Sequence, residues 1–82
     1  MPLYLDILNL PGVTAKDAAA DHRKDRHIQD QYGVKYASYW VDERAGKVFC
    51  LIDAPDPALA TAVHRHAHGL VPGQIFEVTE GR

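Results

Sequence analysis

The sequence predicts an α+β domain in which a four-stranded antiparallel sheet carries two helices on one face. Apolar stretches typical of strands and stretches with helix start and stop signals alternate in the order strand, helix, strand, strand, helix, strand. This order is the ferredoxin-like plan, and right-handed crossovers place both of its helices on the same face of the sheet. A length of 82 residues is enough for one small domain, residues 1–82, and for no second one.

The first half of the chain predicts a strand and a helix. Residues 3–8 are apolar apart from one aspartate and predict the first strand. Thr14 is expected to cap the helix that follows, with Asp17 at the capping-box position. A run of alanines favours helix through Tyr32, and Gly33 is expected to end it in a left-handed conformation.

The second half predicts two strands, a helix and a last strand. Residues 34–42 and 47–54 form the two strands, and residues 43–46 form a hairpin loop between them. An aspartate suited to capping and a proline suited to the first helical position predict a helix over residues 57–68. Residues 75–79 supply the last strand.

The alternation of side chains in the third strand predicts a homodimer. Val48, Cys50 and Ile52 point to one face of the sheet, whereas Phe49 and Leu51 point to the other. Helices cover only one face, so a second copy of the chain is expected to cover the other, with large contact residues nearby: Tyr36, Tyr39 and Trp40. The alternative is that Phe49 and Leu51 lie at a partly wet surface.

Composition argues against several classes of protein. Nine basic against eleven acidic residues give a net charge of −2, so neither nucleic acid nor an anionic membrane is expected as a partner. No leader or transmembrane segment is evident, and a cytoplasmic location is expected. Cys50, the one cysteine, excludes an internal disulfide and is expected to pack as a small hydrophobe.

Five histidines are the unusual feature of this composition. His64 and His68 are four residues apart on the second helix, so they lie on one side of it and could bind one metal ion, while His66 points nearly the opposite way. Imidazole suits nickel, zinc, copper and cobalt. The alternative is that His64 and His68 are polar flank residues that cap the last turn or bond to neighbouring strands.

The first helix offers further metal ligands. His22 is followed by Asp25, and His27 by Asp30, each at a spacing of three residues that puts the pair on one face. The inner stripe of this helix is polar, and a buried charge or imidazole must be paired, hydrogen-bonded or metal-bound. The alternative is a solvated helix in which His22 is merely hydrogen-bonded.

Three runs of the sequence are distinctive: Tyr39-Trp40-Val41-Asp42-Glu43, Gly46-Lys47-Val48-Phe49-Cys50-Leu51 and, most specific, Val63-His64-Arg65-x-Ala67-His68-Gly69. In these runs the chain resembles a family of small bacterial proteins of unknown function that includes an actinobacterial nickel-binding protein. The resemblance implies a ferredoxin-like homodimer that binds a nickel ion in sequestration, storage or detoxification. It brings no established enzymatic activity with it, so no enzyme is expected.

The resemblance also divides the histidines. His22, His64 and His68 match positions where the family tends to carry histidine, whereas His27 and His66 do not. An inner site around the shared histidines and a surface site using the extra pair both remain open. The choice of nickel over other divalent metal ions comes from the resemblance alone.

We therefore expect a nickel-binding protein with histidine and carboxylate ligands. The candidate ligands are all five histidines: His22, His27, His64, His66 and His68. A second hypothesis is a small dimeric α/β-barrel enzyme with a His or Tyr general base, because Asp6, Tyr36, Trp40 and His22 are expected to approach one core region. A third hypothesis, a small-ligand sensor that signals through the dimer, has less support.

Overall fold

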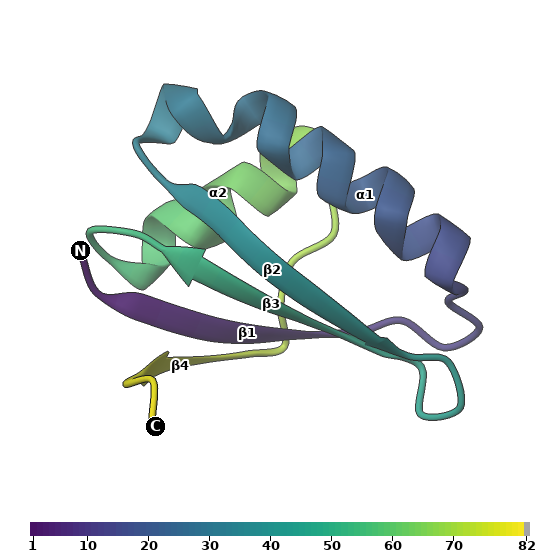
Figure 1. The fold of residues 1–82 in the computed structure, drawn as a ribbon. Helices are drawn as coiled ribbons and strands as arrows, with labels where there is room; N and C mark the ends of the chain where they lie inside the picture. Colours follow the sequence, from purple (N-terminus) through teal and green to yellow (C-terminus); the bar gives the residue numbers. More distant parts are fainter. Residues whose placement is uncertain (82) are drawn as a thin grey trace.

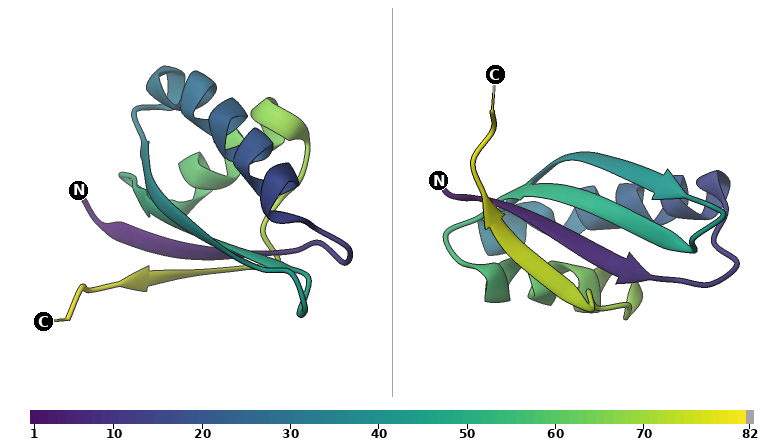
Figure 2. Two further views of the ribbon diagram at one scale, coloured as in Figure 1. Left: turned by 45° about the vertical axis from the view of Figure 1, so that its right-hand side comes forward. Right: turned by 90° about the horizontal axis from the view of Figure 1, so that it is seen from below.

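A computed structural model describes residues 1–81 and has the predicted order of elements (Figure 1). The elements are β1 (Leu3–Asn9), α1 (Ala15–Ile28), β2 (Lys35–Asp42), β3 (Lys47–Asp53), α2 (Pro57–His68) and β4 (Gln74–Val78). The four strands form one antiparallel sheet in the order β2-β3-β1-β4. Both helices lie on the same face of this sheet, as predicted, and leave the other face open (Figure 2).

The helix ends confirm the capping signals, with one correction. The Thr14 and Asp17 side chains form the predicted capping box, and Asp56 caps α2 ahead of Pro57. However, α1 ends at Ile28, and residues Gln29–Tyr32 form a tighter 3₁₀ turn instead of the predicted α-helix. Gly33 still ends this segment in the left-handed region, where its lack of a Cβ removes the steric cost.

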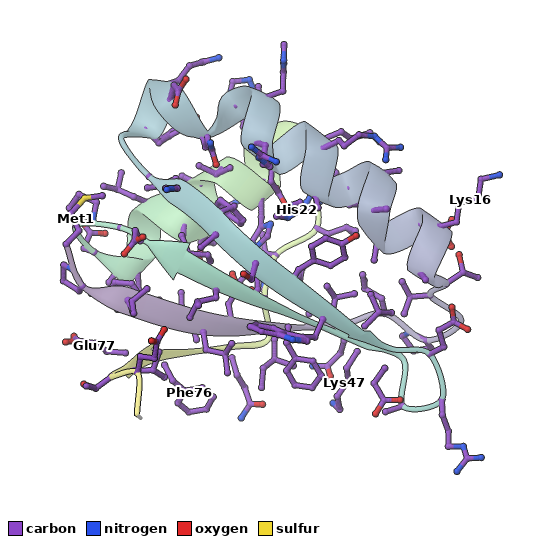
Figure 3. All side chains as sticks on the ribbon, in the orientation of Figure 1. Met1, Lys16, His22, Lys47, Phe76 and Glu77 are labelled. Atoms are coloured by element: carbon purple, nitrogen blue, oxygen red, sulfur yellow. The ribbon has the colours of Figure 1, made fainter. Side chains whose placement is uncertain are left out.

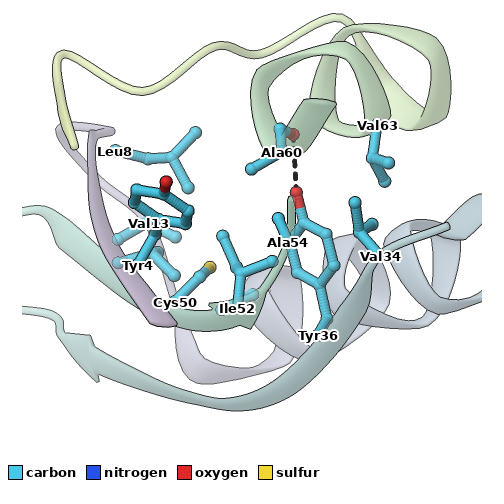
Figure 4. Packing of buried hydrophobic residues seen from close by; sticks show 12 residues of the cluster. Tyr4, Leu8, Val13, Val34, Tyr36, Cys50, Ile52, Ala54, Ala60 and Val63 are labelled. Carbon is cyan, nitrogen blue, oxygen red and sulfur yellow. Dashed lines mark hydrogen bonds between the residues drawn. The ribbon is translucent and has the colours of Figure 1, made fainter. Parts of the chain in front are cut away.

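The core lies between the sheet and the two helices (Figure 4). The alternation predicted for β3 is confirmed, because Val48, Cys50 and Ile52 are buried beneath the helices. The phenolic oxygen of Tyr36 donates a 2.7 Å hydrogen bond to the carbonyl of Ala60 on α2. This hydrogen bond links β2 to α2 and gives the buried hydroxyl of Tyr36 a partner, as buried polar groups require.

A β-bulge in β2 changes which aromatic side chains face the core. Tyr36 pairs with Ile52 but Ser38 pairs with Leu51, so one residue of β2 has no partner on β3. An extra residue reverses the alternation beyond it. As a result, Tyr36 and Tyr39 both face the helices, and the expectation that they help to cover the open face was wrong.

The open face of the sheet carries the remaining apolar side chains. Trp40 is 53% exposed and Phe76 is 48% exposed, and Phe49 and Leu51 lie between buried and exposed. Figure 3 shows Phe76 on the side of the sheet away from the helices. Because Trp40 pairs with Phe49 on this face, it does not approach the core region with Asp6 and His22 as expected. No helix among residues 1–81 is long and apolar enough to cross a membrane.

A candidate metal centre beneath the helices

His64 is a fully buried histidine on α2 that lies between two carboxylates. Its Nε2 atom is 2.8 Å from Asp6 Oδ2 on β1, and its Nδ1 atom is 3.0 Å from Asp25 Oδ1 on α1. Asp6 and Asp25 are themselves 0% and 2% exposed. Since both ring nitrogens face an acceptor, the ring donates from both and carries a positive charge.

His68, one turn further along α2, reaches the same oxygen of Asp25. Its Nε2 atom is 3.0 Å from Asp25 Oδ1 and 3.3 Å from His64 Nδ1. The backbone N–H of Leu70 donates to His68 Nδ1 over 3.3 Å, so in this state the His68 proton is on Nε2 and is donated to Asp25. Three atoms that could ligate a metal ion, Asp25 Oδ1, His64 Nδ1 and His68 Nε2, therefore form a triangle with edges of 3.0, 3.0 and 3.3 Å.

The carboxylates set the protonation of the cluster. Burial by itself lowers the pKa of His64, but its hydrogen bonds to Asp25 and Asp6 outweigh that effect and raise the pKa to about 11. Burial raises the pKa of Asp25, yet the bonds from His64 and His68 produce a net lowering. Asp25 is therefore a carboxylate and His64 an imidazolium at neutral pH.

His22 lies beside this cluster, on the side of α1 that faces the sheet (Figure 3). Its ring stacks on Tyr39 with 4.4 Å between the ring centroids, and its buried Nδ1 atom has no partner among the described residues. Burial lowers the pKa of His22, so the ring is neutral and can act as a ligand.

A small cavity of about 10 Å³ adjoins the cluster, and its lining includes His22, Asp25, His68 and Cys50. A volume of this size suits one atom-sized ligand, such as a water molecule or an ion. Sites for organic ligands are typically about 300–1,000 Å³. The cavity within one chain is therefore far smaller than a typical site for an organic ligand.

A second group of candidate ligand side chains also includes His64. The ligand atoms of Asp6, Cys50 and His64 all lie within 4.8 Å of one another. Burial raises the pKa of the Cys50 thiol to about 11 despite its hydrogen bond to His64. Among residues 1–81, this group and the Asp25, His64 and His68 group are the clusters with three metal-ligand side chains in reach of each other.

Comparison with known proteins identifies the family and the fold of the chain. The family model described as "Nickel responsive protein SCO4226-like" matches residues 4–78. The chain belongs to the SCO4226-like nickel-responsive family. A search of curated proteins finds no match. Among solved structures, the crystal structure of SCO4226 from Streptomyces coelicolor A3(2) is similar, with a TM-score of 0.89 over 98% of this chain and 99% of that one. At 23% sequence identity, this structural likeness concerns the fold.

The predicted histidines of this SCO4226-like protein separate into an inner and an outer set. His64 and His68 form the inner cluster together with Asp25, and His22 lies next to them. The alternative that His64 bonds to a neighbouring strand also describes part of the arrangement, because Asp6 belongs to β1. His27 and His66 are exposed and line a groove on the outer side of the helices.

Two residues of the cluster were not predicted as ligands from the sequence. Asp6 was expected near the core but not as the partner of His64, and Cys50 was expected only to pack. A signal for Asp6 exists in the sequence, since it is the one charged residue in an otherwise apolar strand. No comparable signal distinguishes Cys50 from a packed small hydrophobe.

Proposed function

We propose that this protein binds nickel(II) at the buried cluster of Asp25, His64 and His68 and serves in nickel sequestration, storage or detoxification. The observation that carries the proposal is the triangle of ligand atoms with edges of 3.0, 3.0 and 3.3 Å. Neighbouring ligands of an octahedral ion with bonds of about 2.1 Å are about 3.0 Å apart. The three atoms thus have the spacing of one triangular face of such a site.

The charge of the cluster also favours a divalent cation. Without metal, two carboxylates and one imidazolium leave the core with a net charge of −1 (−1 − 1 + 1), which is costly in a buried position. A divalent ion in place of the His64 Nδ1 proton gives a net charge of 0 (−1 − 1 + 2). Nickel binding would therefore neutralise a buried charge.

Asp6 supports the same assignment by holding the other side of His64. Histidines that bind metal usually donate their second ring N–H to a carboxylate, which fixes the ring and makes the ligand nitrogen more basic. The 2.8 Å contact between His64 Nε2 and Asp6 Oδ2 supplies this partner. His22 Nδ1, buried and without a described partner, adds a fourth candidate ligand atom beside the cavity.

His68 must change its tautomer when it binds metal through Nε2. A neutral imidazole has one proton, so the proton moves to Nδ1 and the weak bond from the Leu70 N–H is given up. His64, by contrast, loses its Nδ1 proton to solvent. The exchange releases one proton for each nickel ion.

The proposal includes a homodimer formed through the open face of the sheet. Trp40 and Phe76 are about half exposed there, and Phe49 and Leu51 extend the same apolar surface. An apolar face of this kind on a monomer favours association, and a second copy of the chain would bury it. The buried metal cluster lies on the other side of the sheet, so the two features are independent.

Isothermal titration of metal-free protein with nickel tests the site. We expect tight binding by the parent chain and by a His27→Ala/His66→Ala variant, and loss of the buried site in a His64→Ala/His68→Ala variant. The outer pair is the matched control, because it also removes two histidines, one from α1 and one from α2, but both are exposed and lie outside the core. Unchanged stoichiometry in the His64→Ala/His68→Ala variant, with loss in the control, would overturn the assignment.

A further inference from the structure

The sheet side of His64 holds a second set of ligand side chains. Asp6 on β1 and Cys50 on β3 are direct cross-strand partners, and both point toward the helices. Cross-strand partners have Cβ atoms about 5 Å apart, so the register of the sheet by itself brings this carboxylate and this thiol together. They are 0% and 3% exposed.

The hydrogen bonding of Asp6 is incomplete at this point. Its Oδ2 atom accepts from His64 Nε2, but its Oδ1 atom is buried and accepts no hydrogen bond from any of residues 1–81. A buried carboxylate oxygen without a partner is costly and calls for an explanation. A cation held by Asp6 Oδ1 and the neighbouring Cys50 Sγ would satisfy this oxygen.

We propose that Asp6, Cys50 and His64 Nε2 form a second metal position, selective for a thiophilic divalent ion such as Zn²⁺ or Co²⁺. Their ligand atoms lie within 4.8 Å of one another. A carboxylate, a thiolate and an imidazole are a donor set typical of zinc, and a thiolate disfavours hard ions such as Mg²⁺ and Ca²⁺. Because this position shares His64 with the proposed nickel site of Asp25, His64 and His68, this inference rests in part on the proposed function.

Loading of the second position releases protons and balances charge. The Cys50 thiol and His64 Nε2 each lose a proton to solvent. When both positions are filled, His64 bridges them as an imidazolate. Two carboxylates, one thiolate and one imidazolate then carry four negative charges, which two divalent ions neutralise. The net charge of the buried side chains and ions is thus zero when one ion fills the proposed nickel site. It is zero again when both positions are filled.

Cobalt(II) is the spectroscopic probe of choice for this position. Reduced, metal-free protein is titrated with Co²⁺ without oxygen, and the thiolate-to-cobalt charge-transfer band in the near ultraviolet is followed. We expect the band to appear and binding to reach two ions per chain. In Cys50→Ser, we expect the band to vanish and binding to fall to one ion. Absence of the band in the parent chain at saturation would overturn the inference.

Two further arms keep the two proposals separable. The His68→Ala variant should lose nickel binding at Asp25, His64 and His68 but keep the thiolate-to-cobalt band. If the band persists and the nickel stoichiometry is unchanged, the proposed nickel ligands are rejected and the Cys50 position is supported. If Cys50→Ser does not fold, X-ray absorption at the zinc edge of the zinc-loaded parent chain decides. A sulfur neighbour at about 2.3 Å supports the position, and a shell of nitrogen and oxygen alone overturns it.

Discussion

Replacing His64 with leucine is the most informative perturbation of the metal-free protein. The substitution puts an apolar side chain of similar size in the place of His64 and removes the cation that pairs with Asp6 and Asp25. Breaking a buried ion pair by removing one partner costs about 3–5 kcal/mol. Domains of 60–100 residues lose about 4–8 °C of Tm for each kcal/mol, so the expected fall is roughly 12–40 °C.

Thermal unfolding followed by circular dichroism measures this loss, with His66→Leu as the matched control. His66 lies on the same helix but is exposed, and its described partner is the Tyr32 hydroxyl at 3.1 Å. The control should change Tm by only a few degrees. A His64→Leu variant that unfolds within a few degrees of the control would refute the view that His64 neutralises the buried carboxylates.

The pH dependence of the same comparison has a defined sign. The folded pKa of His64, about 11, lies above the ordinary value of 6.5, so its stabilisation is complete below pH 6.5 and is lost as pH rises through 11. The Tm difference between the parent chain and His64→Leu should therefore shrink as pH is raised from 7 to 10.5. A difference that grows over this range would contradict the assignment.

Three more predictions concern separate features. Nickel titrations in buffers of different ionisation enthalpy should show release of about one proton per ion, because His64 loses a proton and His68 only relocates one; release of none would reject this exchange. Tyr36→Phe should lower the free energy of unfolding in urea by about 1 kcal/mol through loss of the Ala60 bond, with nickel stoichiometry unchanged. Trp40→Ser combined with Phe76→Ser should shift the light-scattering mass from dimer to monomer; a parent chain that is already monomeric would reject the proposed interface.

Local sequence signals were sufficient for most of the fold. Thr14 and Asp17 cap α1, and Asp56 and Pro57 start α2. The preferences of these residues for the capping and first helical positions depend only on contacts within one helical turn. The end of α1 was the exception, since residues 29–32 tighten into a 3₁₀ turn before the glycine cap. Nothing in the order of these four residues distinguishes the two kinds of turn.

Long-range geometry was harder to predict. The bulge in β2 places both Tyr36 and Tyr39 under the helices, although strict alternation would have separated them. The contact between Asp6 and His64 joins residues 58 positions apart, so it depends on how the sheet and α2 pack. The spacing of His64 and His68 did predict a shared side of the helix, because that relation is local.

The central claim is that nickel lies inside the domain, bound by Asp25, His64 and His68. Crystals of the nickel-loaded protein, measured at the nickel absorption edge, give an anomalous difference map that locates the ion directly. We predict a peak within bonding distance of Asp25 Oδ1, His64 Nδ1 and His68 Nε2. Peaks confined to the outer histidines, His27 and His66, with none in the core would contradict it.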